Sequence, residues 1–195
     1  MGLILEMCQT GKYDTDKFYE GSYAHPKSQS SRHTYVESVY DVIFQRLKES
    51  ATNILEIGAY SGGSHLLWRD YFTNARIVAM DINPVPALEN QERIDLHIGD
   101  AYCMQSVNKF QDGFFDIIID DGPHTYESMN YTLSFYSRKL KDGGILVIED
   151  VASINWVNPL IQCLPQKYQQ IANVYDLRAN IGRVDDILIV VDTGK

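Results

Sequence analysis

Residues Phe115 to Glu127 read FDIIIDDGPHTYE, a strand-like run followed by polar turn residues. The stretch opens with a short run that is almost wholly apolar and rich in isoleucine, which is typical of a strand buried on both faces in a parallel sheet. The run ends at Asp120 and Asp121, which are followed by the turn pair Gly122-Pro123 and by His124. Ligands of open α/β sheets bind outside the carboxyl ends of the strands. These polar residues are therefore candidates for a functional site.

A second apolar run strengthens that interpretation. Residues Gly144 to Ile148 also read as a buried strand, and they end in Glu149 and Asp150. A simpler alternative for the first run is that one of its aspartates caps the following helix and that the histidine is merely solvated. Four acids and a histidine at two strand ends favour a divalent metal site instead, because carboxylate oxygens are the ligands that hard cations prefer.

The rest of the chain alternates between strand and helix patterns. Strands are predicted at 53–58, 75–81, 93–100, 169–175 and 185–192, with 93–100 near a sheet edge because it alternates polar and apolar residues. Helices are predicted at 33–50, after Gly63, and at 126–140 with a stop at 141–144, while 156–164 is a short helix or a loop and 180–184 a hairpin turn. This order predicts a doubly wound, mostly parallel α/β sheet with helices on both faces and an antiparallel strand at the C-terminal end.

The first predicted strand runs into a glycine-rich turn, Glu56-Ile-Gly58-Ala-Tyr60-Ser-Gly62-Gly63-Ser64. A strand, a glycine turn and a helix form the unit that cradles nucleotides, because glycines let the backbone approach the ligand and the helix start offers free N–H groups. The spacing lacks the G-x-G-x-x-G form of dinucleotide enzymes, which disfavours a dehydrogenase. Asp81 lies about twenty residues further on, where a ribose hydroxyl is usually held.

Composition bounds the classes of protein that fit. The 195 residues, 45% hydrophobic and 22% charged, predict one globular domain at 32–195 behind an N-terminal arm or lid at 1–31. A net charge of −9 argues against nucleic acid as the partner. No apolar run reaches the ~18 residues of a membrane span, and three scattered cysteines fit neither a disulfide framework nor a zinc motif, so a cytoplasmic location is expected.

The order of these motifs resembles the class I S-adenosylmethionine-dependent methyltransferases, which have a Rossmann-like fold, and most closely the metal-dependent sugar O-methyltransferases of the macrocin and mycinamicin type. The motifs that carry the resemblance are Asp14-Thr-Asp-Lys17, Leu55-Glu-Ile-Gly58, Trp68-Arg-Asp-Tyr-Phe72, Ile119-Asp-Asp-Gly-Pro-His124 and Val147-Ile-Glu-Asp150. The chain departs from the family pattern at Asp14, where a glycine is usual, and at Pro123, where a serine is frequent.

The resemblance implies S-adenosyl-L-methionine and Mg²⁺ as cofactors, a sugar or glycan acceptor, and a dimer or larger homo-oligomer. It implies His124 as the general base, with Asp121 also catalytic and Asp121, Glu149 and Asp150 as metal ligands. The cofactor-binding residues that it implies are Glu56, Gly58, Tyr60, Gly62, Ser64, Asp81, Asp100, Ala101 and Asp120.

Several alternatives stay open at this point. One is an O-methyltransferase of phenols, although that group resembles an Asp-Asn pair where this chain has Glu149-Asp150. Others are a relative of the cephalosporin type, a non-catalytic protein that keeps the fold as a scaffold, and a nicotinamide-dependent oxidoreductase. Among the other histidines, His25 and His33 are weaker candidates to flank the site, whereas His65 and His97 read as structural.

Overall fold

The computed structural model describes residues 2–18 and 33–194, so His25 lies outside the described residues. It contains a seven-stranded sheet in the order β3-β2-β1-β4-β5-β7-β6. The strands are β1 (Asn53–Ile57), β2 (Arg76–Asp81), β3 (Ile94–Ile98), β4 (Phe115–Asp120), β5 (Leu140–Ile148), β6 (Ala172–Asp176) and β7 (Ile187–Asp192). The first five strands run parallel, and β7 pairs antiparallel with both β5 and β6. The predicted doubly wound sheet with an antiparallel C-terminal strand is confirmed.

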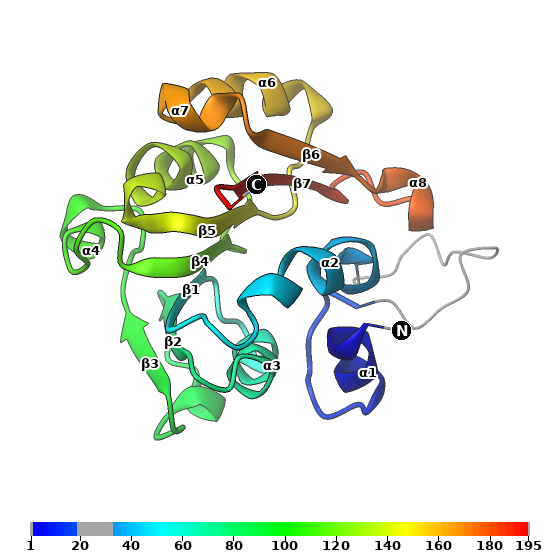
Figure 1. The fold of residues 1–195 in the computed structure, drawn as a ribbon, viewed down its shortest axis with the longest axis vertical. Coiled ribbons are helices and arrows are strands. Elements are labelled where there is room, and N and C mark those ends of the chain that lie inside the picture. Colours follow the sequence, from blue (N-terminus) through cyan, green and yellow to red (C-terminus); the bar gives the residue numbers. More distant parts are fainter. Residues whose placement is uncertain (1, 19–32, 195) are drawn as a thin grey trace.

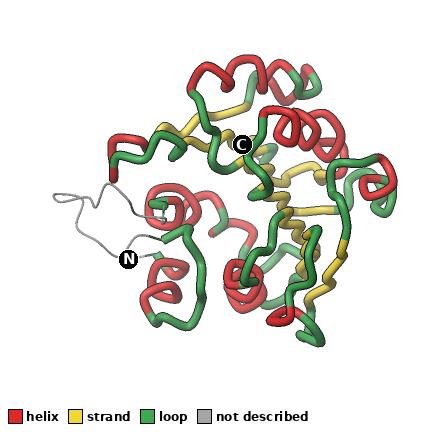
Figure 2. The backbone as a smooth tube through the Cα atoms, turned by 180° about the vertical axis from the view of Figure 1, so that it is seen from behind, coloured by secondary structure: helices red, strands yellow, loops and turns green. Residues whose placement is uncertain are grey.

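Helices cover both faces of this sheet (Figures 1 and 2). On one face lie α1 (Leu3–Gln9), the consecutive helical turns η1 (Val36–Tyr40), α2 (Asp41–Ile43) and η2 (Gln45–Leu47), and α3 (Gly63–Tyr71). On the other lie α4 (Met104–Val107), α5 (Tyr126–Tyr131) with η4 (Thr132–Tyr136) and η5 (Ser137–Lys139), α6 (Ile154–Gln162) and α7 (Gln166–Gln169). Two short elements, η3 (Pro86–Leu88) and α8 (Arg178–Ile181), connect strands.

The central strands are buried on both faces because their side chains alternate between two cores. In β4, Ile117 and Ile119 join the core beneath α3, whereas Ile118 joins the core beneath α5. This is the packing that the continuous apolar run predicted. Strand β3, whose pattern alternates, lies at the edge of the sheet as expected.

The helix α5 begins at a capping box rather than at the acids. The side chain of Thr125 accepts from the backbone N–H of Ser128, and the side chain of Ser128 accepts from the N–H of Thr125. The alternative that Asp120 or Asp121 caps this helix is therefore wrong, and both carboxylates are left for other partners.

Three predicted boundaries differ from the structure. Helical turns end at Lys139 and β5 begins at Leu140, because Leu140 already pairs with Phe115 and a register shift follows before Ile117. The glycines at 143–144 lie inside that strand instead of ending the helix. Gln169 belongs to α7, and the connection from β6 to β7 contains α8, which ends at Gly182 with φ +78°.

The described part of the predicted N-terminal arm packs into the domain. The side chains of Ile4, Cys8, Tyr13 and Phe18 belong to the core beneath α1 and α3. The carboxylate of Asp41 accepts from the N–H groups of Ile4 and Leu5 at 2.8 and 3.2 Å, which anchors the start of α1 on the neighbouring helical turns. No helix in the described ranges is long and apolar enough to cross a membrane.

Candidate active site

A cavity of about 830 Å³ lies at the carboxyl ends of β1 to β4. Its wall is formed by the residues that follow each of these strands, together with Asp14, Thr15 and Asp16 from the N-terminal segment. This is the position where open α/β sheets bind their ligands, and the volume is in the range of about 300–1,000 Å³ typical of small-molecule sites.

Gly58 explains how the cavity wall closes. It adopts φ +89°, and a Cβ atom placed there would lie 1.9 Å from the carbonyl oxygen of Asp121. Only glycine permits this approach, which brings the turn after β1 against the loop after β4. Gly63 permits a second one, since its Cβ would lie 1.8 Å from the carbonyl oxygen of Asp14. The two glycines therefore allow the loop after β4 and the N-terminal segment at Asp14 to pack against the glycine turn, where they form two walls of the cavity.

Asp81 holds the glycine turn in place. One oxygen of its carboxylate accepts from the N–H groups of Ala59 and Tyr60 at 2.8 and 3.3 Å, and the other accepts from the N–H of Asn83 at 2.8 Å. Burial raises the pKa of Asp81, but these backbone hydrogen bonds outweigh it and lower the pKa below the usual value. The carboxylate stays ionised at the cavity wall.

Six of the nine residues implied as cofactor-binding line the cavity: Gly58, Tyr60, Ser64, Asp81, Asp100 and Ala101. The other three lie behind its wall. Glu56 is fully buried and accepts from Ser64 Oγ at 2.9 Å, and Gly62 is the N-cap of α3 with φ +86°. Asp120 accepts from the hydroxyls of Tyr102 and Thr132, each at 2.6 Å, so its carboxylate braces the wall instead of facing the cavity.

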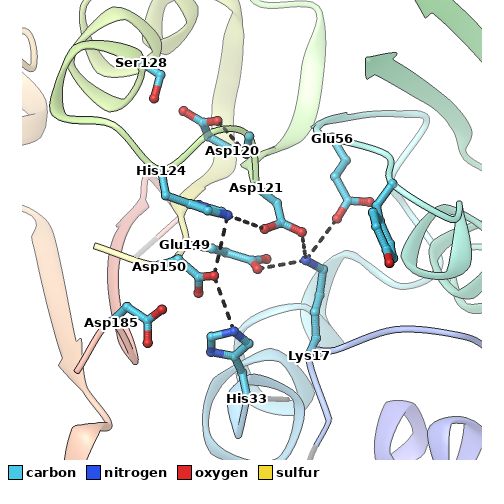
Figure 3. Close-up of polar contacts among 12 residues, drawn as sticks. Lys17, His33, Glu56, Asp120, Asp121, His124, Ser128, Glu149, Asp150 and Asp185 are labelled. Atoms are coloured by element: carbon cyan, nitrogen blue, oxygen red, sulfur yellow. Dashed lines mark hydrogen bonds and ion pairs between the residues drawn. The ribbon is translucent and has the colours of Figure 1, made fainter. Parts of the chain in front are cut away.

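Of the four acids predicted at the strand ends, Asp121, Glu149 and Asp150 lie together with His124, whereas Asp120 does not join them (Figure 3). His124 Nε2 lies 3.8 Å from Asp121 Oδ1 and 3.6 Å from Asp150 Oδ2. One ligand atom from each of these three residues lies within 4.8 Å of the others, which suits a single metal ion. His124 and Asp150 both have φ +53°, a sparsely populated conformation for such residues and one that clusters at functional sites.

The left-handed conformation of Asp150 also explains how two adjacent acids serve one cluster. Neighbouring residues of a regular strand point to opposite faces. Here β5 ends at Ile148, and the backbone turns at Asp150, so Glu149 and Asp150 lie side by side in Figure 3.

Lys17 was missed by the sequence analysis as a member of this cluster. Its side chain is 1% exposed, and its ammonium lies 2.6 Å from Asp121 Oδ2, 2.8 Å from Glu149 Oε2 and 3.3 Å from Glu56 Oε1. The three acids stand at the ends of the neighbouring strands β1, β4 and β5. Although burial lowers it, the charges of Asp121 and Glu149 raise the pKa of Lys17 well above its usual value.

A second buried cation flanks the cluster on the side of Asp150. His33 contacts Asp186 Oδ1 through Nδ1 at 2.9 Å and Asp150 Oδ2 through Nε2 at 3.3 Å. Burial lowers the pKa of His33, but the hydrogen bonds to Asp150 and Asp186 raise it to about 10. The hydroxyl of Tyr35, which stacks on His33, donates to the other oxygen of Asp150. His33, a weaker candidate from the sequence, therefore lies next to the acid cluster.

The cluster carries more negative charge than its own cations offset. Burial raises the pKa of Glu149 to about 7, even though Lys17 lowers it, and Asp150 and Glu56 raise it further. Burial, Glu149 and Asp150 raise the pKa of Asp121 despite Lys17. The pKa of Asp150 falls to about 2 because the bonds from His33 outweigh its burial. Crowded carboxylate oxygens beside an imidazole fit a hard divalent cation such as Mg²⁺.

The chain is similar to known methyltransferases. The model of a methyltransferase domain family matches residues 55–151. Demethylmacrocin O-methyltransferase of Streptomyces fradiae is 29% identical over 163 residues, covering 78% of this chain and 40% of that protein. A tetracenomycin rhamnose 3'-O-methyltransferase of Streptomyces olivaceus is 34% identical over 123 residues, covering 58% of this chain and 31% of that protein. The chain thus spans well under half the length of these relatives.

Solved structures share the fold. The MycE methyltransferase of the mycinamycin pathway, solved in complex with Mg and SAH, has a TM-score of 0.61 at 21% identity, covering 80% of this chain and 48% of that one. Spermidine synthase from Thermotoga maritima has a TM-score of 0.56 at 17% identity, covering 76% of this chain and 56% of that one. From the family match we conclude that residues 55–151 form a methyltransferase domain, and the chain is similar to the macrocin- and mycinamicin-type sugar O-methyltransferases.

Proposed function

We propose that the protein is a Mg²⁺-dependent O-methyltransferase that transfers the methyl group of S-adenosylmethionine to a hydroxyl of a deoxysugar, another sugar or a glycan. The observation that carries the proposal is that the cavity and the acid cluster share a wall. Asp121 and His124 line the cavity, and Asp121 and Asp150 are the two acids of the group that could hold a metal ion, which leaves the imidazole of His124 for proton acceptance. A methyl donor in the cavity would therefore lie next to a hydroxyl held at the cluster.

The cavity has the features that the donor requires. Its length runs from the glycine turn, past Asp81, to Asp100 and Ala101. The first turn of α3 has no side-chain cap, so its N–H groups are available to the carboxylate of the methionine moiety. Carboxylates at Asp81 and Asp100 suit the hydroxyl and amino groups of an adenosyl ligand.

The chain's own residues supply positioning and proton acceptance. Methyl transfer from a sulfonium to oxygen is an in-line displacement, for which alignment of the two reactants can supply about 7–11 kcal/mol in the best cases. We assign His124 as the base that accepts the proton of the acceptor hydroxyl through Nε2, and Asp121 and Asp150 orient the imidazole by their charge at 3.6–3.8 Å. Bound at Asp121 and Asp150, with Glu149 as the third ligand that the resemblance implies, Mg²⁺ would stabilise negative charge on the acceptor oxygen.

The proposal is tested by calorimetry followed by a transfer assay. The purified protein is titrated with S-adenosylhomocysteine, with and without Mg²⁺, and with NAD as the control. We expect the adenosyl ligand to bind and NAD to be inert. Labelled S-adenosylmethionine is then offered with a panel of deoxysugars, nucleotide-linked sugars, glycosides and catechols. Transfer to a catechol alone would favour the phenol alternative, and absence of binding by either ligand would favour the scaffold alternative.

We also propose that the protein acts in the cytoplasm, because its three cysteines are scattered and odd in number and so do not form the disulfide framework that is typical of proteins from oxidising compartments.

A further inference from the structure

The proposed chemistry has no use for Lys17, although its ammonium lies at the centre of the acids. The residue reaches them from the segment that forms one wall of the cavity, and its side chain is 1% exposed. Its hydrogen bonds join residues 104 and 132 positions away in the chain. A buried ammonium in such a place has to be stabilised by its partners, because an unpaired buried charge is costly.

Both oxygens of Glu149 have partners other than a metal. Its Oε2 lies 2.8 Å from the ammonium of Lys17, and its Oε1 accepts from the hydroxyl of Tyr40. Glu149 is 1% exposed and Tyr40 is fully buried, so neither partner is readily exchanged for water. Within the ranges that the structure describes, the group suited to a metal ion contains Asp121, His124 and Asp150 but not Glu149.

The two oxygens of Asp121 face different neighbours. Oδ2 lies 2.6 Å from the ammonium of Lys17, whereas Oδ1 faces His124 Nε2 at 3.8 Å. Asp150 Oδ2 faces the same imidazole nitrogen at 3.6 Å. An ammonium and a divalent cation repel each other, which favours their binding to different oxygens of the cluster. The cluster therefore divides into an inner half that holds the ammonium and an outer half that is next to the cavity.

We propose that Lys17 is a positioning residue that divides the acid cluster. Its ammonium occupies the cation position at Glu149, Glu56 and one oxygen of Asp121. A divalent cation is then held by Asp121 and Asp150 beside His124. The inference rests on the metal dependence of the proposed function. It reassigns Glu149 from a metal ligand, as the family resemblance implies, to a partner of the lysine.

Metal binding to the purified full chain tests the division directly, with Mn²⁺ as the probe, followed by calorimetry and by the loss of its free electron paramagnetic resonance signal. The variants are Glu149→Gln and Asp150→Asn, which keep the size and shape of each side chain. We expect Asp150→Asn to weaken Mn²⁺ binding by more than about 100-fold and Glu149→Gln by clearly less, since loss of an indirect partner typically costs about 10- to 100-fold at most. Equal losses in the two variants would overturn the inference.

Lys17→Met supplies the second half of the test. Without the ammonium, Glu149 and Asp121 Oδ2 become available, so Mn²⁺ binding should tighten and should now depend on Glu149. The double variant Lys17→Met/Glu149→Gln should therefore lose affinity relative to Lys17→Met, whereas Glu149→Gln alone changes little. Lys12→Met is the matched control, because Lys12 lies in the same segment and its ammonium pairs with Asp70 at 2.7 Å on the surface. It should leave Mn²⁺ binding unchanged.

The outcomes separate this inference from the proposed function. If the wild-type protein binds no Mn²⁺, the metal dependence of the proposed function fails. The inference then stands only if Lys17→Met creates a Mn²⁺ site that depends on Glu149, and it is overturned if no such site forms. Circular dichroism melting curves establish that each variant is folded, and the comparison of Glu149→Gln with Asp150→Asn decides the inference if Lys17→Met does not fold.

Discussion

Substitution of Gly58 by alanine should damage both the stability of the domain and its acid cluster. Two costs combine at this position. An alanine at φ +89° is in the left-handed region, which costs roughly 1–2 kcal/mol for a residue with a Cβ atom. That Cβ would also lie 1.9 Å from the carbonyl oxygen of Asp121, so the loop after β4 has to move, and overpacking of this kind costs about 1–3 kcal/mol.

The two costs sum to roughly 2–5 kcal/mol, which is a large part of the about 5–15 kcal/mol that stabilises a typical domain. For a chain of this size the melting temperature should fall by roughly 4–20 °C, at about 2–4 °C for each kcal/mol. Because the displaced loop carries Asp121, we also expect divalent cation binding to weaken.

Gly113→Ala is the matched control. Gly113 also has positive φ, +67°, but a Cβ atom there would meet nothing within 4 Å. Its substitution should carry the conformational cost alone, and the effect of alanine on the unfolded chain cancels between the two variants. Urea denaturation with linear extrapolation measures both free energies of unfolding. If Gly58→Ala lowers the free energy of unfolding no more than Gly113→Ala does, the close approach of the two loops does not stabilise the site.

Three further predictions concern the site. His124→Ala should lower methyl transfer by about 100- to 10,000-fold, as loss of a general base does, with S-adenosylhomocysteine binding nearly intact. His97→Ala is the control, because His97 lies in β3 and its ring packs on Phe110. Equal loss of binding and transfer in His124→Ala would make His124 structural. Removal of divalent cations with a chelator should abolish transfer and spare S-adenosylhomocysteine binding, so turnover that persists in excess chelator would contradict the metal role. Asp81→Asn should destabilise the protein at neutral pH. The folded-state pKa of Asp81 lies below its unfolded value of about 3.9. The difference in free energy of unfolding between the variant and wild type should therefore be full above that pH and vanish as the pH falls through the folded-state pKa. Urea denaturation of both proteins at neutral and acidic pH measures this, and a difference that does not depend on pH would exclude the ionised carboxylate as its cause.

Much of the site followed from local sequence because of how parallel sheets are built. The acids at Asp121, Glu149 and Asp150 stand directly after buried strands, and the carboxyl ends of parallel strands meet at one edge of the sheet. The glycine turn and Asp81 follow the same rule. The boundary at 140–144 failed because tertiary pairing overrode a local glycine signal, since Leu140 pairs with Phe115. At 180–184 Gly182 does act as a local stop, because it is the C-cap of α8, but the sequence pattern did not indicate the short helix before it.

The order of strands and helices and the presence of an acid at each strand end could be predicted from the sequence alone, because hydrophobic period and turn residues act over a few neighbours. Which of these acids share the ammonium of Lys17 depends on tertiary contacts. Lys17, Tyr40 and His33 lie more than 100 residues away from Asp121, Glu149 and Asp150, which they contact. Hydrophobic period and turn residues do not predict these contacts. The proposed division of the carboxylates between the ammonium of Lys17 and a divalent cation depends on the conformation of Asp150 and on the burial of Lys17. Both are properties of how the packed chain fills space, since a buried charge has to find its partner wherever the fold places one.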